Sequence, residues 1–246
     1  MKKIMTLFLC FALIQVTQAQ FGKLKKAAKK AEDKISSVTD GSGLSQDEVG
    51  KALKEALNNG VSKASDALSA ENGYLNSAYK IPIPAEAQSV FNRVKKVPGF
   101  QNAEDKMVKL LNQAAENAAT KAKPIFVSAI KQMTIRDAMD ILMGKDDAAT
   151  RYLEKTTSKP LFKEFMPVIQ NSLDEVNART YWKSVVKAHN KLPRVKKADP
   201  ELDRYVTNKA LVGMFGLIEE KELDIRENQS ARSTDLLKKV FAKQDK

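Results

Sequence analysis

One stretch of the chain, residues 103–123, constrains the fold more than any other. Its apolar residues recur at intervals of three and four, which places them on one face of an α-helix: Met107, Leu110, Leu111, Ala114 and Ala118. The adjoining arc is small or polar: Asn112, Ala115, Glu116 and Ala119. A helix that can pack on two faces belongs inside a bundle, so we expect residues 103–123 to form the central helix.

The remaining composition favours an all-α fold. Lys, Glu, Ala and Leu are abundant, and no segment shows the period-two alternation of apolar and polar residues that is typical of strands. With 43% apolar residues, the chain can bury a large core. We therefore predict a single all-α domain, a multi-helix bundle, over residues 44–246.

Local motifs predict several helix boundaries. Ser45 with Glu48, and Thr134 with Asp137, have the spacing of capping boxes, in which each side chain binds a free backbone amide at a helix start. Pro160 is expected to open a helix of its own, separate from the one before it, because proline disrupts the interior of a helix.

The first 19 residues have the pattern of a secretory signal peptide. A basic start and a short apolar run lead to Ala19, a small residue suited to cleavage, and the run is too short to span a bilayer. We expect export to the periplasm or the exterior, with at most peripheral attachment to a membrane. Cys10, the only cysteine, follows the bulky Leu9, which does not favour a lipoprotein. Its removal would leave no thiol for disulfides or metal binding.

The formal net charge of +12 is concentrated in two places. Residues 20–38 carry six lysines and two acids and predict a basic amphipathic helix, with a flexible linker to residue 43. This helix could dock on the body or bind a membrane or partner. Residues 177–198 carry seven basic side chains and no acid: Arg179, Lys183, Lys187, Lys191, Arg194, Lys196 and Lys197. Such side chains often form only a solvated face, but the missing acids favour an anionic partner.

Several short strings together resemble one bacterial family. They are Ile-Pro-Ile-Pro at 81–84, Leu-Asn-Gln-Ala-Ala-Glu at 111–116, Gly-Lys-Asp-Asp-Ala-Ala-Thr at 144–150, and further strings at 205–211 and 219–241. In order and spacing they are similar to the family catalogued as domain of unknown function 4197, over roughly residues 44–241. The resemblance implies a secreted or envelope-associated helical protein with no assigned reaction.

No motif dictates a reaction. His189 is the only histidine, so multi-histidine metal sites are excluded. Its lysine-rich stretch is expected to be exposed, which does not favour a catalytic role. A glycine-rich phosphate loop is absent, and Asp146 with Asp147 predict a helix start rather than a cation site. We expect no metal and no cofactor, and the sequence leans away from an enzyme.

Asn112 and Glu116 are the best candidates for a buried polar cluster, joined from elsewhere in the chain by Asp137, Thr150 and Arg226. They lie one helical turn apart and can bind each other or a shared partner. Three interpretations stay open: a structural network that fixes helix register, a ligand pocket between helices, and carboxylate catalysis. For catalysis, the sequence places no second acid nearby.

The sequence favours a secreted protein that binds anionic envelope material through its basic patches. The candidate partners are lipid headgroups of a membrane surface, lipopolysaccharide or an acidic protein. The alternative is a small-ligand-binding helical bundle or enzyme with a polar pocket around Asn112 and Glu116. Nucleic acid ranks third, because export, few aromatic residues and the absence of a known module argue against it. A large cavity at Asn112 and Glu116 would favour the alternative, and a packed core with exposed basic residues would favour the first hypothesis.

Overall fold

The computed structural model describes residues 45–195 and 202–242. The predicted signal peptide, N-terminal basic helix and linker lie outside these residues, as do Lys196 and Lys197. The described residues form nine α-helices, one 3₁₀ turn and no strand, which confirms the all-α bundle. The helices are α2 (Gln46–Ser69), α3 (Ala85–Val94), α4 (Ala103–Ala119), α5 (Ala122–Gln132), α6 (Ile135–Leu142), α7 (Ala148–Glu175), α8 (Ala178–Asn190), α9 (Leu202–Glu227) and α10 (Asp235–Phe241), and the turn is η1 (Gln229–Ala231).

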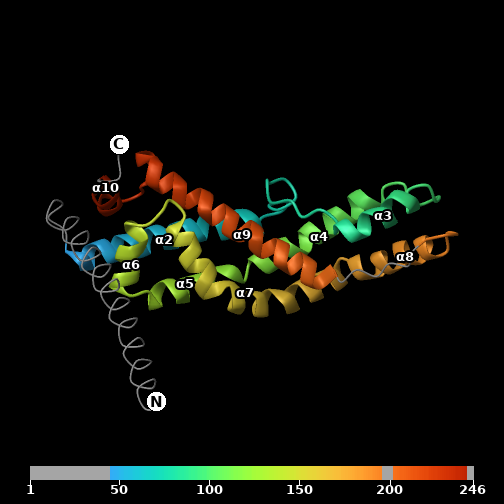
Figure 1. Cartoon of the computed structure of the whole chain (residues 1–246), viewed down its shortest axis with the longest axis horizontal. Coiled ribbons are helices and arrows are strands. Elements are labelled where there is room, and N and C mark those ends of the chain that lie inside the picture. Colours follow the sequence, from blue (N-terminus) through green and yellow to red (C-terminus); the bar gives the residue numbers. More distant parts are fainter. Residues whose placement is uncertain (1–44, 196–201, 243–246) are drawn as a thin grey trace, which may run out of the picture.

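Helix α4 holds the central position that its sequence predicts. It packs against α2, α3, α5, α7, α8 and α9 (Figure 1). The helix ends at Ala119 rather than at residue 123, so its predicted length was wrong by about one turn. Pro124 gives the reason, because its ring would clash with the carbonyl of Thr120 in a continuous helix. The chain turns there and α5 starts at Ala122.

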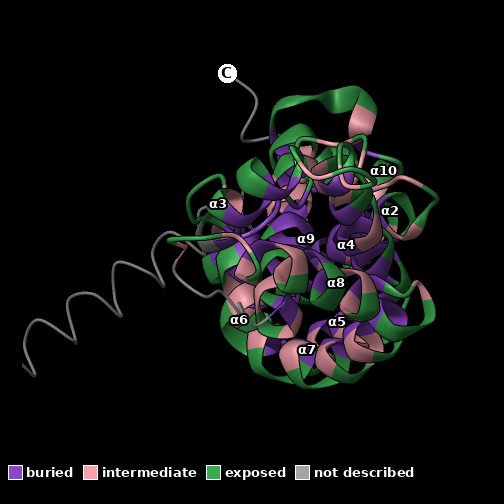
Figure 2. Cartoon of the chain, turned by 90° about the vertical axis from the view of Figure 1, so that its right-hand side faces the viewer, coloured by how far each residue is buried: buried purple, intermediate pink, exposed green. Residues whose placement is uncertain are grey.

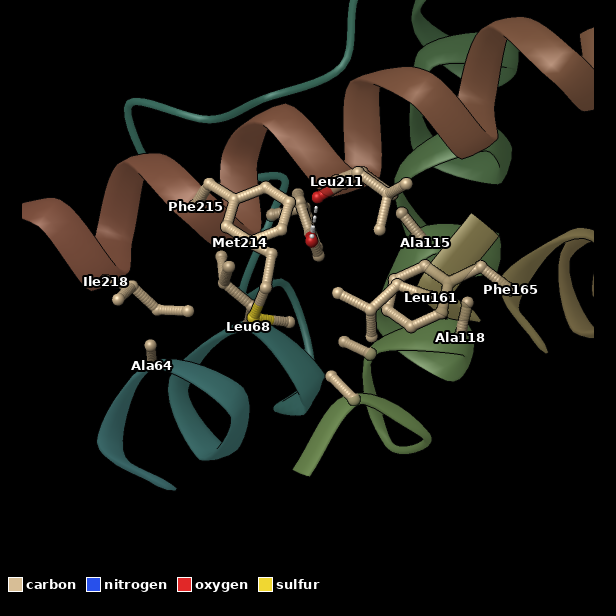
Figure 3. Packing of buried hydrophobic residues seen from close by; sticks show 14 of the residues in the cluster. Ala64, Leu68, Ala115, Ala118, Leu161, Phe165, Leu211, Met214, Phe215 and Ile218 are labelled. Atoms are coloured by element: carbon tan, nitrogen blue, oxygen red, sulfur yellow. Dashed lines mark hydrogen bonds between the residues drawn. The ribbon is translucent and has the colours of Figure 1, made fainter. Parts of the chain in front are cut away.

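Small side chains on α4 let its neighbours approach closely. Ala114, Ala115, Ala118 and Ala119 have no exposed surface. Figure 3 shows Leu161 and Phe165 of α7 beside the alanines of α4, and Met214, Phe215 and Ile218 of α9 facing Ala64 and Leu68 of α2. The core therefore continues through the middle of the bundle, as Figure 2 shows in a view along the length of the molecule.

The prediction that Pro160 opens a separate helix was wrong, because Pro160 lies inside helix α7. It runs unbroken for 28 residues with Pro160 and Pro167 inside it. A buried stripe crosses both prolines and packs on α4 and α9: Leu153, Thr157, Leu161, Phe165 and Ile169. Both prolines are exposed, so water can bind the carbonyls that lack an amide partner. Tertiary packing thus outweighs the local preference against proline.

The two predicted capping boxes are present. The Ser45 side chain accepts from the backbone of Glu48, whose carboxylate accepts from the Ser45 amide at 2.8 Å. Thr134 and Asp137 repeat this arrangement at the start of α6. Asp137 is therefore engaged at a helix end. The hydrogen bonds from Thr134, its side chain first, lower the pKa of Asp137.

Helices α3 and α8 lie together at one end of the elongated molecule, on the right in Figure 1. Phe91 of α3 stacks on Trp182 of α8 with ring centroids 5.5 Å apart. Trp182, Val185 and His189 share the inner face of α8, and His189 is only 2% exposed. The prediction that His189 is exposed was wrong, because its spacing from Trp182 and Val185 places it on the apolar face despite the surrounding lysines.

Candidate functional site

The first buried polar cluster holds the loop that joins α2 to α3. Glu116 on α4 is 7% exposed, and its carboxylate accepts from three backbone amides of this loop. The donors are the amides of Asn72 at 3.2 Å, Tyr74 at 3.2 Å and Leu75 at 3.4 Å. Burial raises the pKa of Glu116, and these amides oppose that effect. Glu116 therefore supplies acceptors to three loop amides, of which the Tyr74 amide is buried.

Asn112 binds the far end of the same loop. Its side-chain oxygen accepts from the Ile81 amide at 2.8 Å, and its Nδ2 donates to the Ile81 carbonyl at 2.8 Å. Nδ2 also donates to the Val108 carbonyl at 2.7 Å. Asn112 and Glu116 thus share a partner segment, which is one of the two arrangements that their spacing predicts.

The other side of the loop rests on α9. The Tyr74 hydroxyl donates to the Ala210 carbonyl at 2.7 Å, and the Tyr79 hydroxyl donates to Glu220 at 2.6 Å. The Tyr79 side chain lies against Gly213 and Gly216. A β-carbon at Gly213 would come within 2.9 Å of the Tyr79 Cβ, and one at Gly216 would come within 2.4 Å of the Tyr79 ring. The two glycines therefore permit the close approach of loop and helix.

A second buried cluster ties the start of α7 to α9. Glu222 accepts from the amides of Ala149 at 2.9 Å and Thr150 at 2.7 Å, and from the Thr150 hydroxyl at 2.8 Å. Arg226 donates to Glu222 at 2.8 Å and to the Ile141 carbonyl at 3.0 Å. The carboxylate lies at the positive end of α7, where it is favoured electrostatically.

The five predicted cluster residues thus fall into three separate places. Asn112 and Glu116 hold one loop, Thr150 and Arg226 belong with Glu222, and Asp137 caps α6. The sequence analysis missed Glu222, which lies one turn before Arg226. The four-residue spacing of Glu222 and Arg226 indicates an ion pair on one helix face. It does not indicate burial, because many exposed acid–base pairs have the same spacing.

Two cavities occur in the described residues, and the first adjoins the second cluster. One of about 20 Å³ lies between α2, α9 and α10 beside Glu222 and Arg226, and it is large enough for about one water molecule. A groove of about 730 Å³ lies between α5 and α7. Its two charged lining residues, Lys121 and Glu164, have opposite signs, and its buried Thr157 already donates to the Leu153 carbonyl. Neither cavity is lined by Asn112 or Glu116.

The basic residues of α8 separate into two groups. Arg179, at the start of the helix, forms ion pairs with Asp174 of α7 and Asp203 of α9. These acids lie outside the acid-free stretch, so counting charges along the sequence could not find them. The remaining described cations of the stretch are exposed: Lys183, Lys187, Lys191 and Arg194.

Helix α3 adds a second acid-free segment at the same end of the molecule. Residues 87–103 contain three exposed cations and no acid: Arg93, Lys95 and Lys96. Together with the four exposed cations of 183–194 they form a surface that we call the basic tip. Acids flank the segment on both sides: Glu86 lies within α3, and Glu104 and Asp105 lie at the start of α4, where Glu104 accepts from Gln88 at 3.1 Å. Sequence analysis missed the α3 contribution because only the contact of α3 with α8 brings the two segments together.

Among residues 45–195 and 202–242, no helix has both the length and the apolar content needed to cross a bilayer. The same residues contain no group of three or more His, Cys, Asp or Glu side chains placed to hold a metal ion.

The described residues thus define an all-α bundle whose buried charges bind its own backbone and which carries two acid-free, basic segments at one end. The chain belongs to the family described as "Protein of unknown function (DUF4197)", whose model matches residues 43–242. Searches of the curated proteins and of the solved structures each gave no match.

Proposed function

We propose that this protein binds anionic material of the cell envelope through the basic tip. The observation that supports the proposal most strongly is the meeting of two acid-free segments, 87–103 and 176–195, on adjacent helices. Seven exposed cations then lie at one end of the molecule, and their attraction for an anionic surface adds up. Export by a signal peptide of residues 1–19 belongs to the same proposal.

The polar pocket hypothesis receives less support. Both oxygens of Glu116 accept backbone amides, and both polar atoms of Asn112 are hydrogen-bonded to backbone. A ligand at this position would have to displace the loop that joins α2 to α3. The arrangement therefore favours a structural role for both residues.

Charge reversal at the tip tests the proposal. Lys183→Glu, Lys187→Glu and Lys191→Glu together should weaken binding to anionic vesicles roughly a hundredfold or more, because each cation near such a surface contributes up to about 1 kcal/mol. Co-sedimentation with anionic and neutral vesicles measures the loss. Raising the salt concentration should weaken binding of the unmodified protein in the same way.

Helix α7 offers a matched control. Lys155, Lys159 and Lys163 are exposed and have the same spacing of four, but they lie in the middle of the molecule. Reversing them changes the net charge equally and should reduce binding much less. Equal losses from the two triple variants would show that total charge, rather than the tip, determines binding. Binding that is indifferent to both variants and to salt would overturn the proposal.

A further inference from the structure

We infer that the anionic partner of the basic tip is a lipid bilayer, and that two loops at this end enter the headgroup region. The inference rests on the proposed function and names its partner. The first loop, residues 95–102, follows α3, and the second, residues 191–195, follows α8. Both lie at the end of the molecule that is on the right in Figure 1.

The first loop places apolar residues directly after its two lysines, and the second places them between its lysine and its arginine. The first reads Lys-Lys-Val-Pro-Gly-Phe from residue 95, and the second reads Lys-Leu-Pro-Arg-Val from residue 191. Pro98, Gly99 and Pro193 are exposed, while Val97 and Leu192 are half-buried. Lysine and arginine side chains can remain among charged headgroups while neighbouring apolar residues reach the acyl boundary. An acidic protein partner would need the cations but not this apolar centre.

Several backbone amides of the two loops have hydrogen-bond partners within the protein. The amide of Val97 donates to the Val94 carbonyl at 2.8 Å, and that of Phe100 donates to the Val97 carbonyl at 3.1 Å. The Gly99 amide donates to the Gln101 side chain at 3.1 Å, and the Leu192 amide donates to the His189 carbonyl at 2.9 Å. Pro98 and Pro193 have no amide hydrogen. These loop donors therefore need no water, which lowers the cost of entering the interface.

The conformation of the first loop also directs its apex outward. Gly99 has a φ of 86°, in the left-handed region that favours glycine. A β-carbon built at Gly99 would meet nothing within 4 Å, so the apex projects into open space. When an end of the molecule projects, all of its cations can contact a flat surface such as a membrane. Extended polyanions, by contrast, are usually bound in a groove.

A polarity-sensitive dye tests insertion directly. The full chain with Cys10→Ser and Pro98→Cys carries the dye at the first apex, and Cys10→Ser with Asn208→Cys carries it at an exposed site on α9. Vesicles with about a third of anionic lipid should shift the emission of the Pro98 dye to shorter wavelength and leave the Asn208 dye unchanged. Equal shifts at both sites, or no shift at Pro98 with vesicles bound, would overturn the inference.

Removing the apolar side chains gives a second measurement. Val97→Ser with Leu192→Ser keeps every charge and should weaken vesicle binding about tenfold, most visibly at high salt. Emission from Trp182, the only tryptophan, monitors unfolding and should show that this double variant remains folded. An unchanged vesicle affinity would overturn the inference and leave the electrostatic proposal intact. Soluble polyglutamate that binds as tightly as vesicles would identify an acidic polymer as the partner instead. If the unmodified protein bound neither anionic vesicles nor polyglutamate, the proposed function itself would be refuted.

Discussion

Replacing Glu116 with alanine should destabilise the protein by about 2–3 kcal/mol, because it removes the acceptor of three loop amides. The Tyr74 amide is buried and would lose its only hydrogen-bond partner, which accounts for most of the cost. The amides of Asn72 and Leu75 are half-buried, so water can partly replace the carboxylate. Alanine also removes the cost of burying the Glu116 carboxylate. The net loss of stability is therefore smaller than the cost of leaving three amides without an acceptor.

Glutamine at the same position separates charge from hydrogen bonding. Its oxygen can still accept from Tyr74 and Leu75, whereas its amide group would face the Asn72 donor, so we expect a loss of about 1 kcal/mol. Burial raises the pKa of Glu116 above its ordinary value of 4.5. A raised pKa in the folded state means that stability is lost as pH rises from the unfolded pKa through the folded pKa. The stability advantage of Glu116 over Glu116→Gln should therefore be larger at pH 4 than at pH 7.

Urea unfolding, followed by the emission of Trp182, measures these differences, and amide hydrogen exchange reports on the loop itself. In Glu116→Ala, the Tyr74 and Leu75 amides should exchange faster than in the unmodified protein. An unchanged unfolding midpoint together with unchanged exchange at Tyr74 would refute the role assigned to Glu116. A stability difference that grows with rising pH would refute the pKa argument alone.

Two further substitutions test the packing around these clusters. Glu222→Ala should cost about 3–5 kcal/mol in urea unfolding, because it leaves the buried Arg226 without its carboxylate, and leucine at both positions should recover much of the loss. Gly213→Ala should cost about 1–3 kcal/mol, since its β-carbon would lie 2.8 Å from the Tyr74 ring. Gly60→Ala, whose β-carbon would be 3.8 Å from its nearest neighbour, is the matched control and should be neutral or stabilising; equal losses at both glycines would contradict the close-approach argument.

Local sequence patterns predict the helices where packing and local preference agree. The apolar stripe and small arc of α4 predict a central helix, and the capping boxes at Ser45 and Thr134 predict helix starts. The prediction fails at Pro160, where the local rule requires a break but the buried stripe of α7 continues on both sides. Contacts from α4 and α9 supply the missing stabilisation. The spacing of the stripe can be read from residues 148–175, but these contacts cannot.

The candidate site was predictable only in part, for the same reason. Asn112 and Glu116 can be recognised as candidates for burial because they lie among alanines on the arc that adjoins the apolar face of α4. Gln113 and Asn117 lie outside that arc and are exposed. Their partners lie in a loop of irregular structure, and no periodicity identifies which amides of that loop will be buried. Likewise, the charge of residues 177–198 is visible in the sequence, but the pairing of Arg179 and the approach of α3 depend on tertiary contacts.

The buried charges and the exposed cations of the basic tip differ in how much they contribute to the stability of the fold. Glu116, Glu222 and Arg226 are buried, and each binds backbone groups or another charge at short distance, so altering them changes the folded state first. The cations of the basic tip lie beyond the Phe91–Trp182 contact on exposed surfaces, where solvated charges contribute little to stability. Excess positive charge at one end also repels itself, and no described acid in either segment relieves that repulsion. An external anionic surface would relieve it without any change in the fold, and this is the physical basis for the proposal that the basic tip is a binding surface.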